Sequence, residues 1–421
     1  MSASRFALRH TLDVSLVAAC SVSLPAVAAE LPAGTVISAE NIDQIKNNTF
    51  EGHSIASLLT EKMEWRIRNN GWKLPLVKSQ EVPLDPAWVK ASQANEGKVS
   101  INKEACRVDG WSAGVPFPSV DEKDPQAAEK LIWNWHLGQL LGDVSQVPLF
   151  VQLLVDGKTG IHADAVGEYT RYKMNGRLTG DKAVEGDGSE RGRQLLYFKS
   201  PSDMKGVGTY TVMYDSEKVP DVWAYIPAVR RVRRLSGGAW MDPIGSSDQL
   251  QDDLDMFNAR PCWYPGYKLV GKRWVLAVAN GKTETWNPKG RDFNEKYPVL
   301  ENQPPYWNMN NDVFEPREVY VVEATTPSVH PYSKKVMYMD AKYPRIYYVE
   351  AYDRKGEFWK FMETHSYLNK GEGDARTTGV AVIDFQRNHA TFSLIDTATL
   401  KTNFDAKASD FSLQALQKAG R

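Results

Sequence analysis

The chain has 421 residues, of which 42% are hydrophobic and 24% charged, and this composition predicts a packed globular core. Its formal net charge is −1, which excludes a long-range attraction for nucleic acid or for an anionic membrane surface. The 13 tryptophans and 18 tyrosines favour a β-rich fold or a site with broad apolar walls.

Residues 1–29 are typical of a secretory signal peptide. A positively charged start is followed by an apolar stretch over residues 12–24 and then by small residues. We expect cleavage after Ala28 or Ala29 and export to the periplasm. A second interpretation makes Cys20 the lipidated first residue of a lipoprotein, although the apolar stretch before it would be very short.

Cys106 and Cys262 are the two cysteines that remain after cleavage. In an oxidising compartment they can form a disulfide, which would staple the N-terminal region to a loop far away in the sequence. Two free buried thiols are the alternative, and the sequence leaves both open.

Residues 30–150 are expected to form an irregular N-terminal region with two clear helices that packs on the core. Apolar spacing predicts these helices over residues 55–67 and 126–141. The second helix is apolar almost all round, which is typical of a buried helix. We interpret His136, which lies on it, as a core histidine with satisfied hydrogen bonds rather than as a ligand.

Residues 151–400 predict an antiparallel sheet, because short strands alternate with frequent turns. Strand 345–352 has apolar side chains on both faces, so both faces are covered or one lines a cavity. A polar insertion over residues 286–306 is expected to be a surface loop, and the tail 401–421 to contain a short helix. The expected strands cover residues 168–178, 193–199, 207–214, 222–226, 230–235, 267–279, 318–324, 335–341, 345–352, 357–367, 378–385 and 390–394.

The stretch over residues 221–255, DVWAYIPAVRRVRRLSGGAWMDPIGSSDQLQDDLD, is the most distinctive in the chain. A short strand with Trp223 and Tyr225 on one face stops at Pro227, and the next strand has arginines on both faces. These arginines are Arg230, Arg231, Arg233 and Arg234.

Carboxylates follow these arginines at once in the sequence. A covered arginine needs a carboxylate partner, because an unpaired buried charge is very costly. Gly245, Ser246 and Asp248 predict a loop and a helix N-cap that lead into a short acidic helix. An ordinary hairpin edge with a solvated charge run is the plainer interpretation. The candidate partners are Asp242, Asp248, Asp252 and Asp253.

Sequence motifs of common enzymes are absent. Two Gly-Lys-Thr triplets, at residues 157–159 and 281–283, lack the upstream glycine of a phosphate-binding loop. The chain has no HExxH, GxSxG or helix-opening GxGxxG motif, and its histidines show no metal-ligand spacing. We therefore expect a protein that is not an enzyme and holds no cofactor or metal. A hydrolase that uses two of the many carboxylates stays open.

The arginine stretch resembles the signature of outer-membrane lipoprotein-sorting-type proteins, relatives of the Lol carriers. In that family a Trp-x-Tyr-x-Pro strand leads into an Arg-Arg-Val-Arg-Arg run, a Gly-Ser-Asp loop and an acidic helix, and the loop here has one extra serine. Residues 321–361 look like the paired strands of that superfamily. Residues 114–137 are similar to a segment of longer exported proteins of unknown function with the same core.

The resemblance implies a mainly β (α+β) fold, a large curved antiparallel sheet or incompletely closed β-barrel with helices packed on its concave side. It implies an apolar space for an acyl chain or another hydrophobic ligand, whereas aromatic side chains that fill a solid core are the alternative. We expect Trp223, Tyr225 and Pro227 to shape the sheet at this cavity. The arginines are expected to pair with Asp242, Asp248 and Asp252, and any left over to face a cargo headgroup or a partner.

Three functions are carried forward from these observations. The preferred one is a periplasmic carrier for lipid-like or hydrophobic cargo that exchanges it with a membrane transporter or outer-membrane partner. The first alternative is a carboxylate-dependent glycan hydrolase or binder. The second is a non-enzymatic adaptor that docks a transporter through its arginine strand and acidic helix.

Overall fold

The fold is described from a computed structural model that covers residues 28–180, 183–235, 239–283, 286–310, 312–369 and 374–419. Nearly all of the predicted signal peptide, residues 1–27, lies outside these described residues, and so does Cys20. No helix within the described ranges has the length and apolar character needed to cross a bilayer.

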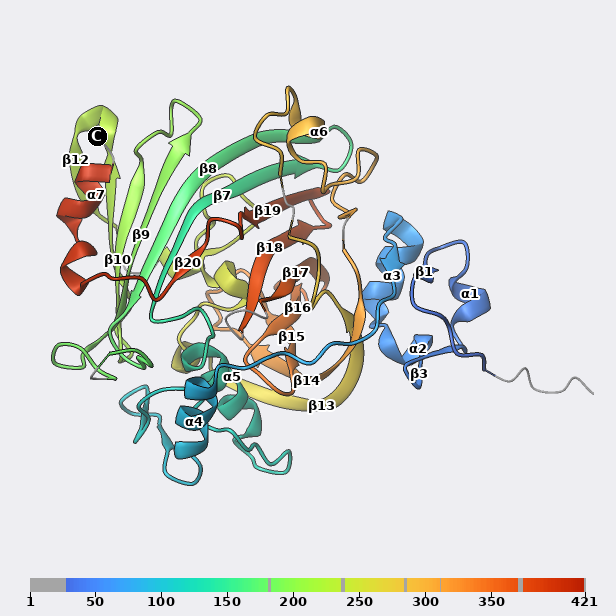
Figure 1. The fold of residues 1–421 in the computed structure, drawn as a ribbon, viewed down its shortest axis with the longest axis horizontal. Helices are drawn as coiled ribbons and strands as arrows, with labels where there is room; N and C mark the ends of the chain where they lie inside the picture. Colours follow the sequence, from blue (N-terminus) through green and yellow to red (C-terminus); the bar gives the residue numbers. More distant parts are fainter. Residues whose placement is uncertain are drawn as a thin grey trace, which may run out of the picture.

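One large antiparallel sheet of 14 strands dominates the molecule (Figure 1). Its first arm consists of β7 (Val144–Asp156), β8 (Gly160–Lys173), β9 (Glu190–Ser200), β10 (Gly208–Tyr214), β11 (Asp221–Ile226) and β12 (Arg231–Arg234). Its second arm consists of β13 (Gly266–Ala277), β14 (Glu315–Thr325), β15 (Lys334–Asp340), β16 (Ile346–Tyr352), β17 (Phe358–Asn369), β18 (Asp374–Asp384) and β19 (His389–Ile395). A short strand, β20 (Lys401–Thr402), pairs with β7.

The two arms meet in the middle of the sheet, where β7 pairs with β19 and Val151 lies opposite Leu394. Each arm is a meander of hairpins, and β12 and β13 form the two outer edges. These edges do not pair with each other in the described part of the chain, so the curved sheet remains an open half-barrel (Figure 1). The predicted fold class is confirmed.

Residues 239–265, which we call the crossing segment, lead from the β12 edge to the β13 edge. They contain three short 3₁₀ turns, η2 (Ala239–Met241), η3 (Gln251–Met256) and η4 (Pro261–Trp263). In Figure 1 this segment lies on the concave side of the sheet rather than around its outside. The predicted acidic helix is therefore a kinked 3₁₀ turn, in which Leu254 and Asp255 leave helical geometry.

The inner face of the second arm is covered by the crossing segment and by α5 (Ala127–Leu137). Side chains alternate across each strand, so Tyr320 and Val322 of β14 face this layer while Val319 and Val321 face away. The indole of Trp135 on α5 donates to the carbonyl of Phe257 at 2.8 Å, which joins the two covering elements. Most of this half of the concave side is a filled core, with a small pocket between α5 and strands β17 and β18 that Trp135, Thr364 and Val380 line.

The outer face is covered by three separate segments. The N-terminal helices pack on the second arm, the insertion before β14 packs on the middle of the sheet, and the C-terminal tail packs on the first arm. The helices outside α5 are α1 (Ile42–Ile45), α2 (Ile55–Leu58), α3 (Glu61–Asn70), α4 (Pro86–Ala94), α6 (Phe293–Lys296) and α7 (Leu413–Ala419). The expectation that helices pack on the concave side thus holds for α5, whereas α1–α3 and α7 lie on the opposite face.

Short elements complete the N-terminal region and the turns. The region contains three two-stranded sheets, and two further 3₁₀ turns lie beside β11 and before α7. These elements are β1 (Val36–Ile37), β2 (Thr49–Phe50), β3 (His53–Ser54), β4 (Leu74–Pro75), β5 (Ser100–Asn102), β6 (Arg107–Asp109), η1 (Pro227–Val229) and η5 (Ala408–Asp410).

The insertion over residues 286–306, expected to be a surface loop, is partly buried. Tyr297, Val299 and Leu300 are at most 5% exposed and pack against the sheet near Leu153. The hydroxyl of Tyr297 donates to Asp164 of β8 at 2.6 Å. A few apolar residues within this polar run are enough to cover the sheet face. They could not be predicted to do so, because they are not spaced with the period of a helix or a strand.

Helix α5 ends at Leu137, four residues earlier than the spacing predicts. Gly138 follows as the C-cap, and it packs so closely that a β-carbon there would lie 2.4 Å from the side chain of Val115. His136 lies on α5 and is 6% exposed, as predicted for a core position.

Candidate functional site

Asp248, in the first part of the crossing segment, is anchored to the middle of the sheet. Its carboxylate accepts hydrogen bonds from His389 at 2.5 Å and from the Thr391 hydroxyl at 2.9 Å, both on β19. The ammonium of Lys360 on β17 donates to its main-chain carbonyl at 2.5 Å. Asp248 is only 2% exposed, so these bonds satisfy a charge that water cannot reach.

Asp252 and Asp253 anchor the next turn to β15. Both carboxylates lie 2.8 Å from the ammonium of Lys335, and all three side chains are fully buried. His330 and Tyr332 add hydrogen bonds to Asp252 and Asp253 at 3.2 and 2.7 Å. Burial alone would raise the pKa of Asp252, but Lys335 and His330 outweigh burial and hold that pKa well below its usual range.

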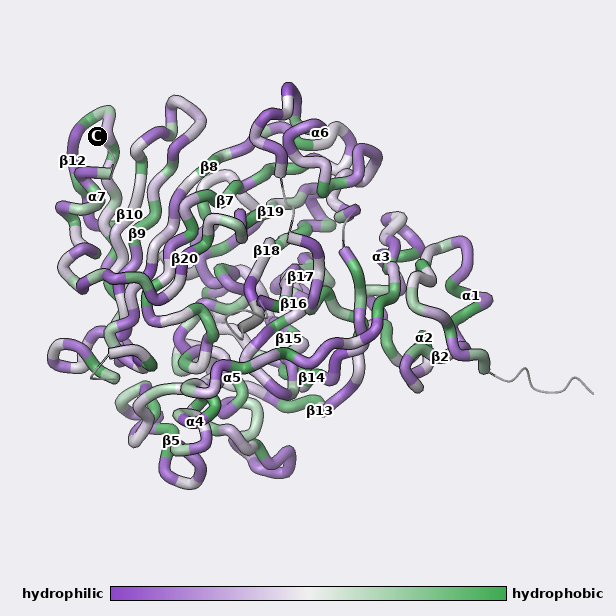
Figure 2. Tube along the Cα trace, viewed as in Figure 1, coloured by the Kyte–Doolittle hydropathy of each residue, from purple (hydrophilic) through white to green (hydrophobic). Residues whose placement is uncertain are grey.

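The arginine strand lies at the exposed edge of the first arm. Arg234 pairs with Asp221 of the neighbouring strand β11. Arg230 has φ = 48° at the end of η1, so the strand starts one residue later than predicted. The tube around β12 is mostly hydrophilic in Figure 2. Within the described residues, no ion pair is formed by Arg230, Arg231 or Arg233.

The predicted pairing of these arginines with Asp242, Asp248 and Asp252 is therefore wrong. Asp248 and Asp252 bind residues of the second arm and of β19 instead, and Asp242 is exposed. The arginines stay on a solvated edge, where they need no buried partner. Gly245 and Ser246 form an exposed turn, in which Gly245 has φ = 57°.

Trp223 and Tyr225 also lie away from the concave side. Both belong to the cluster that the C-terminal tail covers on the outer face, and Trp223 stacks on Tyr210 with ring centroids 5.5 Å apart. The expectation that they shape the cavity is wrong, because alternation places their neighbour Val222 on the inner face instead. Pro227 starts η1 and ends the strand, as predicted from its missing N–H.

The inner face of the first arm is hollow. A groove of about 940 Å³, including its open mouth, lies between β9–β11 and the crossing segment. Its strand wall consists of residues that alternate with the outward-facing cluster, namely Gln194, Thr209, Thr211, Met213 and Val222. Its opposite wall includes Trp240, Leu254 and Trp263 of the crossing segment.

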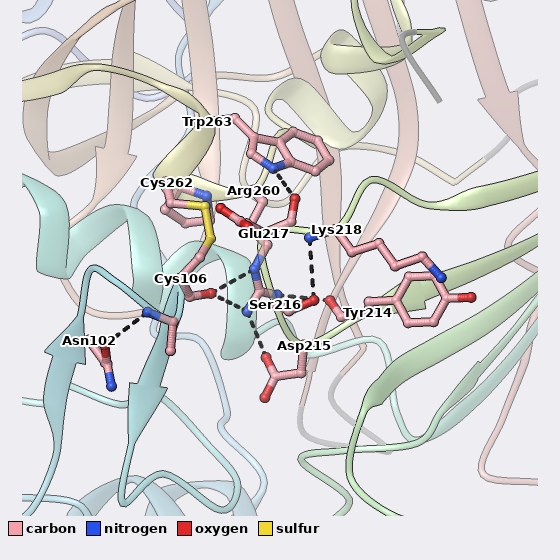
Figure 3. The surroundings of a disulfide bond; sticks show 12 residues. Asn102, Cys106, Tyr214, Asp215, Ser216, Glu217, Lys218, Arg260, Cys262 and Trp263 are labelled. Carbon is pink, nitrogen blue, oxygen red and sulfur yellow. Dashed lines mark hydrogen bonds and ion pairs between the residues drawn. A yellow bond between two sulfur atoms is a disulfide. The ribbon is translucent and has the colours of Figure 1, made fainter. Parts of the chain in front are cut away.

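A disulfide between Cys106 and Cys262 fixes one end of this groove (Figure 3). The guanidinium of Arg260 donates to the carbonyl of Cys106 at 2.5 and 2.9 Å and to the carboxylate of Asp215 at 2.8 Å. The indole of Trp263 donates to the carbonyl of Glu217 at 2.9 Å. These contacts join three segments: the loop after β5, the turn after β10 and the crossing segment. The two cysteines therefore form a disulfide and are not free thiols.

Lys335, His330 and His389 hold the crossing segment in place, and sequence reasoning did not single them out. Their partners lie 78 to 141 residues away in the chain, so no local spacing reveals the contacts. The groove wall had a weak signal, since threonines alternate with Tyr210 and Val212 along β10.

An open β half-barrel, with a solid core under its second arm and a groove under its first, is the class of fold that these elements define. The chain belongs to the family described as "Protein of unknown function (DUF1329)", which matches residues 36–417. This membership confirms the predicted relationship to a family of proteins of unknown function. No curated protein sequence matches the chain.

Solved structures similar to this chain include proteins from three bacteria. A DUF1329 family protein from Desulfovibrio piger is 17% identical, with a TM-score of 0.43 over 65% of this chain and 92% of that one. A domain classed with outer membrane lipoprotein-sorting proteins, from Vibrio parahaemolyticus, is 18% identical, with a TM-score of 0.42 over 65% and 91%. A LolA superfamily protein from Nitrosomonas europaea is 15% identical, with a TM-score of 0.38 over 68% and 98%.

Proposed function

We propose that this protein binds and carries lipid-like or other hydrophobic cargo in the periplasm. The observation that supports the proposal is the groove on the inner face of the first arm, where Val222, Trp240 and Trp263 remain only partly buried. Each CH₂ group that moves from water into such a groove contributes about 0.8 kcal/mol, so no catalytic group is needed to retain cargo.

A binding function fits the groove better than glycan hydrolysis does. A glycoside hydrolase uses two carboxyl groups that flank the bond to be cleaved. The described residues that line the groove include histidine, arginine, lysine, threonine and tryptophan, but neither aspartate nor glutamate. We therefore prefer a non-enzymatic role. Exchange with a membrane transporter and docking through the arginines of β12 stay predictions.

The test replaces a residue of the strand wall by a larger side chain that occupies the groove. Thr211 lies on β10 opposite Val222 and Gln194, with its side chain in the groove. Thr211→Trp should weaken binding of a fluorescent fatty acid by roughly tenfold or more, because losing the burial of two CH₂ groups already costs that much. Thr211→Val has nearly the volume of threonine and serves as the matched control, with affinity close to that of the wild-type protein.

Two results would contradict the proposal. A wild-type protein that binds no fluorescent fatty acid, and that native mass spectrometry after gentle purification shows without bound amphiphile, is not a carrier of such cargo. Equal affinities for the Thr211→Trp and Thr211→Val variants would place the cargo somewhere other than in the groove.

A further inference from the structure

Three cationic side chains gather on the inner face of the first arm, beside the groove. Arg171 and Lys173 alternate with the outward-facing Tyr172 on β8. Arg191 lies on β9 where the pairing register shifts, because Met213 is opposite Gly192 while Tyr214 is opposite Glu190. Such a bulge redirects a side chain, and here Arg191 lines the groove.

None of these three cations has a carboxylate within ion-pair distance in the described residues, unlike the buried Lys335 and Arg317. Two of them, Arg171 and Lys173, donate hydrogen bonds to neutral groups of Gln139, which follows α5. Arg171 donates to the side chain of Gln139 at 3.0 Å, and Lys173 donates to the main-chain carbonyl of Gln139 at 3.3 Å.

Arg191 is the least satisfied of the three. It donates one long bond of 3.4 Å to the carbonyl of His136 and another to the sulfur of Met213, and its buried Nε has no partner. Burial, followed by the charges of Arg260 and Arg171, lowers the pKa of Arg191 to about 9, so it still carries its charge at neutral pH. Burial and Arg171 lower the pKa of Lys173 to about 8.

Asp143 and Asp215 lie near the cluster, but in the described part of the chain neither forms an ion pair with it, and Oδ1 of Asp143 is buried without a hydrogen-bond partner. Asp143 accepts hydrogen bonds from the main-chain N–H groups of Leu178 and Thr179 at 2.8 and 2.6 Å and from the Thr179 hydroxyl at 2.7 Å. Asp215 pairs with Arg260 at 2.8 Å. The cluster therefore keeps an excess of positive charge in a poorly solvated place, which is costly unless an anion completes it.

His136 supplies an independent observation that points to a ligand. It is 6% exposed, it lines both the groove and the space between Arg171 and Arg191, and its Nε2 has no hydrogen-bond partner. Burial and the nearby charges of Arg191 and Arg260 hold its pKa well below the usual range, so the ring is neutral. A neutral imidazole can donate a hydrogen bond without adding further repulsion to the cluster.

We infer that Arg171, Lys173, Arg191 and His136 bind the anionic group of an acidic amphiphile whose hydrocarbon part lies in the groove. The inference rests on the proposed function and names its cargo class, a carboxylate or a phosphate ester with an apolar chain. Arginine matches the planar, multi-oxygen geometry of both groups. The groove and the cluster share His136, Arg191 and Met213, so a single ligand spans the two.

The test compares ligands that differ only in charge. Hexadecanoic acid, hexadecyl phosphate and hexadecanol compete with a fluorescent fatty-acid probe at pH 7. The wild-type protein should prefer at least one of the anions over the alcohol by roughly tenfold, since a hydrogen bond to a charged group contributes about 1.5–3 kcal/mol. Whichever anion competes better identifies the headgroup as a carboxylate or a phosphate ester.

Arg191→Met should abolish this preference for an anion over hexadecanol, and Arg191→Lys should restore part of it. The matched control is Arg193→Met on the same strand, because Arg193 faces outward and pairs with Glu190 at 2.7 Å. Should Arg191→Met fail to fold, Arg171→Met provides the same comparison. Equal binding of all three ligands by the wild-type protein overturns the inference but leaves the carrier function intact, whereas failure of all three to bind overturns both.

Discussion

Lys335 has its charge in a fully buried position between Asp252 and Asp253. Burial lowers the pKa of Lys335, but the two carboxylates outweigh burial and raise it above its ordinary value. The two ion pairs stabilise one conformation of the crossing segment, because any shift of that segment relative to β15 would move the aspartates away from the ammonium of Lys335. Removing Lys335 leaves both carboxylates buried without an opposing ammonium group.

Lys335→Met is therefore expected to destabilise the protein by about 3–5 kcal/mol, the usual cost of breaking a buried ion pair. Lys334→Met is the matched control, since Lys334 pairs with Glu323 on a surface where both side chains are about one third exposed. Its cost should stay within about 1 kcal/mol. Urea unfolding of both variants measures the difference, and equal costs would show that the buried triad contributes no special stability.

Glu315 is a second buried ionisable side chain, and its pKa is shifted upwards. Burial raises its pKa to about 7, although Arg317 lies 3.2 Å from one carboxylate oxygen, and the other oxygen has no partner. The folded protein therefore binds a proton at this carboxyl between its unfolded pKa of about 4.3 and pH 7. Over that interval the free energy of unfolding falls as the pH rises.

Glu315→Gln should remove this slope. The free energy of unfolding of the wild-type protein should fall relative to that of the variant between about pH 5 and pH 8, by on the order of 1–3 kcal/mol. The constant loss of the contact with Arg317 cancels in this comparison, because only the change with pH is measured. Parallel stability curves for the two proteins would refute the assignment.

Among the elements, the crossing segment fills the inner face of the second arm and leaves a groove on the inner face of the first arm. Its acidic turns hold it tightly against β15, β17 and β19, so the second arm has a filled core. On the side of the first arm it is tied chiefly at its end, through η4 and the disulfide (Figure 3). The groove lies between these two attachments.

Removal of the disulfide by Cys106→Ala together with Cys262→Ala is expected to destabilise the protein by about 2–5 kcal/mol, because the bond closes a long loop in the unfolded chain. The separation of 156 residues favours the upper part of this range. Hydrogen exchange should accelerate first in the β5–β6 hairpin, which packs against Trp133 and Leu137 of α5 and which this bond joins to the crossing segment. Unchanged exchange there would show that the contacts of Arg260 suffice to hold the hairpin.

On the scale of the whole molecule, the two arms of the sheet depend on contacts between distant parts of the chain. β7 and β19 pair in the middle although they are separated by the whole remainder of the sheet. Such pairing makes folding slow, because long loops must close before these contacts form. In this strand order, β12 and β13 form the open edges of the sheet. The exposed arginines of β12 disfavour pairing of that edge with another chain, because charged side chains repel one another there.

Much of this architecture could be predicted from local patterns. The short strands, the antiparallel class and the buried α5 follow from apolar periodicity and turn residues. The single helix expected over residues 55–67 is instead two helices, α2 and α3, because the Thr60 hydroxyl accepts a hydrogen bond from the N–H of Met63 at 3.1 Å and caps a new helix. β7 was missed because Pro148 interrupts it, and the structure accommodates this proline where the register shifts between Val147 and Phe150. The first half of β8 was missed as well, since its strand was expected to start at residue 168.

The candidate site was less predictable. Alternation places Trp223 and Val222 on opposite faces of a strand, but it does not say which face is inside, and here the tryptophan is outside. The acidic turn was recognised, yet its partners proved to be Lys335 and His389 rather than the nearby arginines.

The sequence by itself determined the secondary structure, the family signature and the types of residue available, because these depend on neighbours along the chain. Only the tertiary structure decided which charges meet, which sheet face is covered, and where a groove remains beside Arg191. Those outcomes depend on side chains that come together across a hundred residues or more, and the energy of burying a charge is set by the groups that surround it in space.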